Sequence, residues 1–455
     1  MERRFPFSLA LASLGCTTAV MFFCLAVWHM EPQIPLLLGC VIASIAALIG
    51  GYGWRDIGTG IVRSVRQALE AICLLLLIGA LIGVWIAAGV VPAMIRYGLG
   101  LISPRLFLAS AMLVCAILSM VLGSWGTAGT VGLAFMGIAH ALGIPAPLAA
   151  GAVISGSYVG DKLSPLADTT NLAAAVAEVN IFESIRNICK VSLPTLVLCL
   201  GVYAVVGWQY GGDGAAVSTG QMEAVSQTLV QTFRITPLNF LPLLILLVCI
   251  LVKIPPIPSL LIGMGSGAVY GVIVQRAAIG DILRCVWAGY RGHTGVAAVD
   301  ELLSAGGMWS MAGTITIIVL AMSFGGIMEH TGQMASLMAP LIRRTHGFLG
   351  LMTATVFTGV CTNILLPDQY IAITLPGKMY AAAYDEHHIP RKDLALGIGI
   401  SGALTSALVP WNTCGVFMSG VLGVSTAHYL PFAFYNYAMV IAAVVYAAIH
   451  QARQK

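Results

Sequence analysis

The sequence predicts an all-α membrane protein that crosses the bilayer many times, and its composition is the first reason. Of the 455 residues, 59% are hydrophobic and only 9% are charged, whereas a soluble domain carries about 25% charged residues. Apolar runs such as residues 72–91 and 194–208 are long enough to cross the hydrocarbon core of a bilayer. The alternating pattern that is typical of outer-membrane barrels is absent from the sequence.

Apolar segments follow one another along the chain and predict about 11–12 membrane-embedded helices. The first comes after a basic start, MERR, and continues to Trp28 without a convincing cleavage site, so it is predicted to be a spanning helix rather than a signal peptide. Polar stretches at 54–70 and 280–303 are predicted to be amphipathic helices at the membrane surface. The candidate spans lie near 7–28, 33–53, 72–90, 105–122, 146–160, 188–208, 238–253, 257–275, 309–329, 346–366, 394–409 and 430–449.

Charge and motif content exclude several classes of function. The net charge of +4 gives no indication of a nucleic-acid partner. The 11 cysteines are scattered, without a CxxC or a Cys/His spacing suited to zinc, so they are predicted to be core residues. No HExxH is present, and Tyr158 replaces the first glycine of the GxGD used by intramembrane aspartyl proteases, so we expect no enzyme.

Two weakly similar halves are predicted on either side of a polar stretch at 211–231. Residues 148–156 (LAAGAVISG) align with 394–402 (LALGIGISG), and 164–171 (SPLADTTN) align with 408–415 (LVPWNTCG). The positive-inside rule suggests that the two repeats are inverted, although the three arginines between 276 and 291 then lie outside, against that rule. The predicted division is 1–32 for an N-terminal transmembrane helix, 33–208 for the first transmembrane repeat, 209–237 for a polar connecting loop, 238–425 for the second transmembrane repeat, and 426–455 for a C-terminal transmembrane helix and basic tail.

The stretch GSYVGDKLSPLADTTN, residues 156–171, is the strongest candidate for a functional site. A charged side chain at bilayer depth is costly and persists where it pairs or lines a cavity. Gly160 and Pro165 bracket a point where a helix loses backbone hydrogen bonds, so a broken helix is predicted, against the alternative of a surface loop. Oxygen ligands of this kind suit a hard cation such as Na⁺ or Li⁺.

Roles follow for the polar residues of this stretch. A carboxylate at this depth can also take up a proton, because burial and a neighbouring ammonium act on its proton affinity in opposite directions. Asp161 and Asp168 are therefore predicted to bind Na⁺ in competition with H⁺, and Lys162 is predicted to be their charge partner. The predicted neutral ligands are Ser164, Thr169, Thr170 and Asn171.

Three further polar segments are predicted to complete the site. SWGTAGT, residues 124–130, has the small residues and hydroxyls of a re-entrant hairpin tip, although close helix packing would also explain them. CTNILLPDQY, residues 361–370, and VPWNTCG, residues 409–415, place amides and an acid beside prolines, although ordinary loop ends are the alternative. The candidate residues of these segments are Ser124, Thr127, Asn363, Asp368, Asn412 and Thr413.

The chain resembles the NhaC family of sodium/proton antiporters. The likeness is carried by GSWGTAGTVG (123–132), GIPAPLAAGAVISGSYVGDKLSPLADTTNLA (143–173) and TNILLPDQY (362–370), and it extends over about 33–450. It implies inverted repeats with re-entrant hairpins, and exchange of internal Na⁺ for external H⁺ across a bacterial inner membrane. Relatives with the same core exchange organic acids such as malate and lactate, or carry amino acids, so the resemblance leaves the cargo open. Carriers of this architecture often pair, which implies a homodimer; Na⁺, H⁺ and the lipid bilayer are the other predicted partners, with no cofactor.

Overall fold

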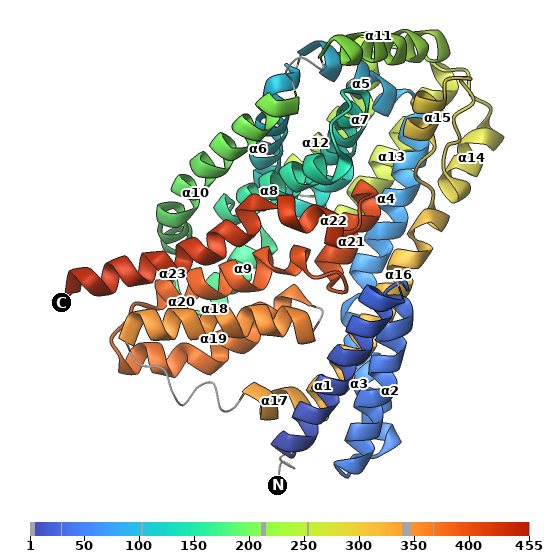
Figure 1. Cartoon of the computed structure of the whole chain (residues 1–455). Coiled ribbons are helices and arrows are strands. Elements are labelled where there is room, and N and C mark those ends of the chain that lie inside the picture. Colours follow the sequence, from blue (N-terminus) through green and yellow to red (C-terminus); the bar gives the residue numbers. More distant parts are fainter. Residues whose placement is uncertain are drawn as a thin grey trace.

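The computed structural model describes residues 5–28, 30–101, 103–210, 215–252, 254–338, 347–366 and 368–454. Over these ranges the chain is built from helices, with no strand (Figure 1). Six helices are long and apolar enough to cross a membrane, and up to nine spans result if each bent helix pair counts as one. The protein is therefore a polytopic α-helical membrane protein, as predicted.

Most helix bounds agree with the predicted spans, but the helix at 181–210 begins before the predicted residue 188, and the helix at 369–386 corresponds to no predicted span. In the first half the helices are α1 (Phe7–Phe22), η1 (Phe23–Val27), α2 (Gln33–Ile49), α3 (Trp54–Gln67), α4 (Leu69–Ala87), α5 (Val90–Leu101), α6 (Phe107–Thr127), η3 (Ala128–Gly132), α7 (Leu133–Ala141), α8 (Ala146–Leu163), α9 (Asp168–Val176) and α10 (Ile181–Tyr210). In the second half they are α11 (Ala215–Thr232), α12 (Leu241–Leu251), α13 (Pro256–Ile273), α14 (Ile279–Ala288), α15 (Ala297–Leu303), α16 (Ala312–His330), α17 (Gln333–Met338), α18 (Gly347–Leu365), α19 (Gln369–Glu386), α20 (Arg391–Gly399), η7 (Ile400–Leu404), α21 (Thr413–Leu422), α22 (Thr426–Tyr429) and α23 (Phe434–Gln454).

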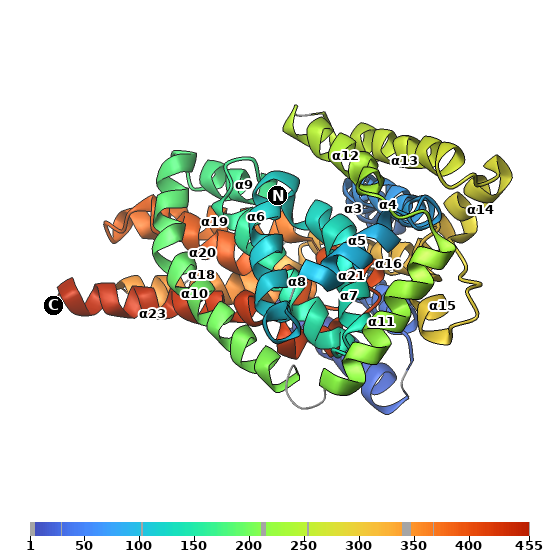
Figure 2. The ribbon, with the colours of Figure 1, turned by 90° about the horizontal axis from the view of Figure 1, so that it is seen from above.

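The helices form two groups that meet at the centre of the molecule. One group contains α1 to α4 and α16, with α3 and α2 packed along α16 and α13 packed outside α4 (Figures 1 and 2). The other contains α18, α19, α20 and α23, which lie beside α10 (Figures 1 and 2). The breaks in α6, in α8–α9 and in α20–α21 lie where the groups meet, so the polar residues of these breaks lie in the interior.

The first broken unit is a helix that turns back at a glycine. Gly156 lies against Met112 and Gly160 against Ala116, so α6 and α8 run parallel. The chain between them must therefore return, and it reverses at Gly123, whose φ of 68° is in the region that favours glycine. The turn predicted at 124–130 thus begins one residue earlier.

The second broken unit repeats this arrangement. Gly359 of α18 lies against Ser401, and Gly397 lies against Met352, so α18 runs parallel to the α20–η7 segment. The Ser119 hydroxyl donates to the Ser157 carbonyl in the first unit, and the Asn363 amide donates to the Ser401 carbonyl in the second. Each bond joins residues 38 positions apart, so in both halves a side-chain donor ties the two parallel helices together. The division into domains and the inversion of the repeats remain predictions.

The predicted polar loop is wrong for most of its length, because residues 215–232 form the helix α11. Val225, Leu229 and Phe233 are buried at a spacing of four residues, which fixes one face of α11 against its neighbours in spite of its polar composition. Residues 211–214 of that stretch lie outside the described residues, as do the basic start at 1–4 and Lys455 at the end of the predicted basic tail.

We expect Gly160→Ala to destabilise the protein. A Cβ at this position would meet the Ala116 carbonyl, the Ser119 hydroxyl and the Met120 amide, and overpacking of this kind costs about 1–3 kcal/mol. The matched control is Gly265→Ala, because a Cβ there has nothing within 4 Å. Thermal unfolding of the purified proteins in detergent should show a lower Tm for the first variant only; equal Tm values would show that α6 and α8 are less tightly packed than described.

Candidate functional site

The break between α8 and α9 is set by a proline. The carbonyl of Asp161 would normally accept a hydrogen bond from the backbone of residue 165, four positions on, but Pro165 has no N–H. The Thr170 hydroxyl replaces that donor and lies 2.9 Å from the Asp161 carbonyl oxygen. The Ser164 hydroxyl donates to the Met120 carbonyl at 2.6 Å and accepts from the Leu166 amide, so it holds the break against α6.

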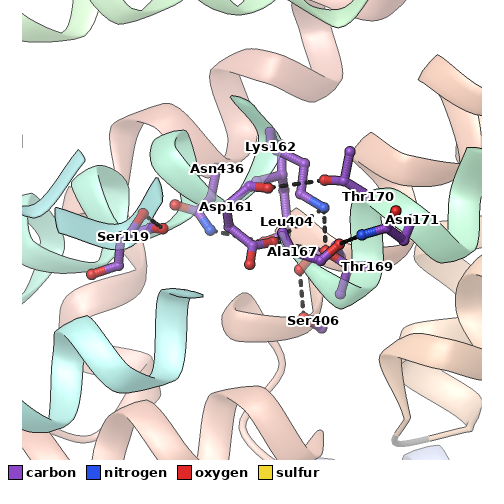
Figure 3. Close-up of polar contacts among 12 residues, drawn as sticks. Ser119, Asp161, Lys162, Ala167, Thr169, Thr170, Asn171, Leu404, Ser406 and Asn436 are labelled. Atoms are coloured by element: carbon purple, nitrogen blue, oxygen red, sulfur yellow. Dashed lines mark hydrogen bonds and ion pairs between the residues drawn. The ribbon is translucent and has the colours of Figure 1, made fainter. Parts of the chain in front are cut away.

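A buried ionic group lies directly beside this break (Figure 3). The Lys162 ammonium is 3.3 Å from Asp161 Oδ2, and the Lys162 side chain is 0% exposed. Lys162 Nζ also donates to Thr169 Oγ1 at 2.6 Å, and Thr169 in turn donates to Asp161 Oδ2 at 2.7 Å. Two buried charges are costly unless they are paired and hydrogen-bonded, and this triad meets both conditions.

The break in the second half is held by two buried amides rather than by charges. The Asn363 amide donates to the carbonyls of Ser401 and Gly402 and to the Thr405 hydroxyl, at 2.7–3.1 Å. The Asn412 amide donates to Asn363 Oδ1 at 2.9 Å, and Asn412 Oδ1 accepts the backbone N–H of Cys414 as the N-cap of α21. Both side chains are therefore occupied in bracing the break.

A cavity of about 340 Å³ lies between the two breaks. Several of the predicted residues line it, and the others lie behind its wall. The predicted residues on the lining are Ser124, Asp161, Asp168, Thr169, Asp368 and Thr413. Those off the lining are Thr127, Lys162, Ser164, Thr170, Asn171, Asn363 and Asn412.

Two of the residues off the lining, Asn171 and Thr127, have side chains that lie away from the cavity. The Asn171 amide donates to the carbonyls of Pro165 and Ala167, which closes the loop of the break. The Thr127 hydroxyl is buried without a hydrogen-bond partner. Neither side chain faces the cavity, so their predicted contact with the cargo has no geometric support.

Four carboxylates from four elements face the cavity: Glu70 of α4, Asp161 of α8, Asp168 of α9, and Asp368, the N-cap of α19. Asp368 Oδ1 accepts the backbone N–H groups of Tyr370 and Ile371 at 2.7 and 3.0 Å. Among the described residues that line the cavity there is no Lys, Arg or His. Asp161 alone of the four has an ion pair in the described part of the chain, so the other three carboxyl groups face the cavity without a compensating cation.

The donors suit an alkali cation better than a transition metal. No group of three or more His, Cys, Asp and Glu side chains is placed to hold a metal ion within the described ranges. Carboxylate, hydroxyl and carbonyl oxygens are the donors that face the cavity instead, through side chains such as Asp161, Asp168 and Thr169. Such oxygens bind hard cations.

Sequence reasoning missed several lining residues. Glu70 was placed at the end of the predicted surface helix, yet it is the acidic residue in the first turn of the apolar helix α4. An acid at the start of a spanning helix, directly after an amphipathic stretch, was the available signal. Other lining residues that the sequence did not single out are Gln67, Trp125, Thr130, Gln369 and Tyr370.

Comparison with known proteins identifies the family. Residues 156–449 match the model of the Na⁺/H⁺ antiporter family. The Na⁺/H⁺ antiporter NhaC of Bacillus subtilis is 33% identical over 438 residues, which cover 96% of each chain. The chain belongs to the Na⁺/H⁺ antiporter family.

Members of the Na⁺/H⁺ antiporter family that are similar to this chain differ in their named cargo. A malate-2H⁺/Na⁺-lactate antiporter of Bacillus subtilis is 34% identical over 415 residues, covering 91% of this chain and 88% of that protein. An arginine/ornithine antiporter, ArcD, of Halobacterium salinarum is 33% identical over 435 residues, covering 95% and 90%. Membership of the Na⁺/H⁺ antiporter family thus indicates a transporter and leaves the cargo to be argued from the site.

Removing the ammonium of the buried triad is expected to destabilise this family member strongly. Lys162→Met leaves the Asp161 carboxylate buried without its partner, which costs about 3–5 kcal/mol. The double variant Lys162→Met, Asp161→Asn carries no buried charge and should recover much of the lost Tm in detergent, although not transport. If the effects of the two substitutions on Tm simply add, the two side chains are not coupled as described.

Proposed function

We propose that this protein is a secondary active antiporter that exchanges Na⁺, or Li⁺, for H⁺ across the bacterial inner membrane. The observation that carries the proposal is the cavity lined by four carboxylates and, in the described chain, by no basic side chain. The field inside such a cavity attracts small cations. The proposal needs no cofactor other than the transported ions, and it includes a homodimer as the assembly.

Exchange results if Na⁺ and H⁺ compete for the same carboxylates. Asp161 and Asp168 are the proposed ion-binding acids, and the Thr169 hydroxyl donates to the Asp161 carboxylate, with both Thr169 and Asp161 on the cavity lining. A carboxylate that holds Na⁺ cannot also hold a proton, so loading one ion releases the other. The paired broken helices on either side of the cavity are the kind of elements that rock between inward-facing and outward-facing states in carriers with internal repeats.

The same cavity argues against an organic anion as the cargo. A carboxylate ligand such as malate would meet the unpaired charges of Asp168 and Asp368. The Lys162 ammonium could attract an anion, but it is engaged by Asp161 and Thr169 and does not line the cavity. An anion would have to break this buried pair, whereas a cation would not.

A cationic amino acid is the second candidate cargo. The cavity volume of about 340 Å³ exceeds what Na⁺ needs and lies within the range of small-molecule sites. Tyr370 and Trp125 add aromatic surface to the lining, and aromatic rings attract organic cations. The named cargo of the relative from Halobacterium salinarum, arginine and ornithine, has the same charge character.

A vesicle assay tests the proposal. In everted vesicles with an imposed pH gradient, Na⁺ or Li⁺ alone should dissipate the gradient, and Asp161→Asn or Asp168→Asn should reduce the rate to near background. Asp281→Asn is the control, because Asp281 is exposed on α14 and pairs with the exposed Arg284. A response to malate, lactate or an amino acid without any response to Na⁺ or Li⁺ would overturn the assignment.

A further inference from the structure

One face of α3 and α4 lines two spaces, a small chamber beside α16 and the main cavity. Helix α3 ends at Gln67 and α4 begins at Leu69, with only Ala68 between them, and the backbone of Ala68 remains in the right-handed helical region. The residues of this face recur every three or four positions, as one side of a helix requires. They are Gly60, Arg63, Ser64, Gln67, Glu70, Ala71, Leu74 and Ile78.

The first part of this face lines a chamber of about 160 Å³ between α3 and α16. Gly60 and Gly326 let the two helices approach closely, because a Cβ on either would meet the backbone carbonyl of the other. The remaining lining is polar: Arg63, Ser64, Gln67, Glu329 and His330.

Gln67 lines both the chamber and the main cavity, so the two spaces adjoin at this side chain. Glu70 lies one turn further along the same face and is exposed to the cavity. Glu70 and Asp168 line the same cavity. The order along the face is therefore chamber, Gln67, Glu70 and then the proposed ion-binding acids.

The balance of charged side chains becomes more negative from the chamber to the cavity. In the chamber the cation Arg63 is offset by Glu329, with His330 beside them. In the cavity Glu70, Asp168 and Asp368 face the space without an ion pair among the described residues. A cation that moves from the chamber to the cavity therefore moves down a gradient of electrostatic potential.

We propose that the α3–α4 face is the wall of an ion access path, and that Glu70 draws the cation from the chamber toward Asp168 and Asp161. The inference rests on the proposed cation exchange and assigns to this acid a positioning role that no motif indicates. Glu70 raises the local cation concentration at the site and does not itself take part in the exchange of Na⁺ for H⁺. Its effect must therefore depend on charge and on salt.

The test measures Na⁺-dependent H⁺ movement in proteoliposomes that contain the full chain. Glu70→Gln should raise the apparent KM for Na⁺ about threefold, the effect of one charge several ångströms away across water, with little change in the maximal rate. Glu70→Asp should keep the KM of the unaltered protein. Glu223→Gln is the control, because Glu223 is exposed on α11 and lines neither space.

Salt separates this role from a structural one. Added N-methylglucamine chloride screens long-range attraction, so the KM of the unaltered protein for Na⁺ should rise toward that of Glu70→Gln. If the substitution instead acts through a packing defect, the difference in KM between the two proteins should remain at high salt. If the unaltered protein exchanges Na⁺ for H⁺, and the Glu70→Gln variant has the same KM for Na⁺ at low salt, the inference about the access path is overturned while the proposed function stands. Equal losses in Glu70→Gln and Glu70→Asp would also overturn it, since the charge would not be the cause.

A substitution at the junction tests the path itself. Gln67 is exposed, so Gln67→Trp should fold, with a Tm close to that of the unaltered protein, but fill the space where chamber and cavity adjoin. We expect the maximal rate to fall several-fold, whereas Gln67→Ala should retain it. A correctly folded Gln67→Trp variant with an unchanged rate would show that ions reach the cavity by another route.

Discussion

A proline at a position where an α-helix needs a backbone donor is the constraint on which the candidate site depends. Pro165 leaves the Asp161 carbonyl without its helical partner, and in an apolar interior no water replaces that partner. The chain satisfies the carbonyl with the Thr170 hydroxyl from the next helix. This bond fixes α9 beside the end of α8, and that placement brings Thr169 between Lys162 and Asp161. The polar triad is thus a consequence of how the break is repaired.

The two halves solve the same problem with different chemistry. Ser119 and Asn363 each donate a side-chain hydrogen bond to a carbonyl of the helix that runs parallel to their own. The break between α8 and α9 carries charges, whereas the break between α20 and α21 carries neutral amides. The amides of Asn363 and Asn412 are used up in holding the backbone. The break between α8 and α9 can therefore respond to an ion through its own charges, whereas the second half contributes one carboxylate, Asp368, to the cavity wall.

The sequence was sufficient for features that depend on local patterns, and insufficient for those that depend on which side of a wall a residue faces. Apolar runs located α4, α8 and α18 within a few residues, and Pro165 located the break. An amide near a proline can either bind an ion or hydrogen-bond to backbone carbonyls, and the sequence around Asn363 did not distinguish between these two roles. Glu70 was missed because an amphipathic helix fits a membrane surface and a cavity wall equally well, and only the packing of α3 on α16 decides between them.

The ion pair between Lys162 and Asp161 also bears on how the transport of Na⁺ is coupled to the transport of H⁺. Because Asp161 is already compensated from within the protein, the uncompensated charges of the cavity are those of Glu70, Asp168 and Asp368. Water can solvate these carboxylates while the cavity is open, but closing an apolar barrier over them would strand unpaired charge. A bound cation or a proton offsets one of these charges, so the loaded site closes at a lower cost than the empty site. On the proposed function, coupling then requires no dedicated gate, since electrostatics alone disfavours the return of the unloaded carrier.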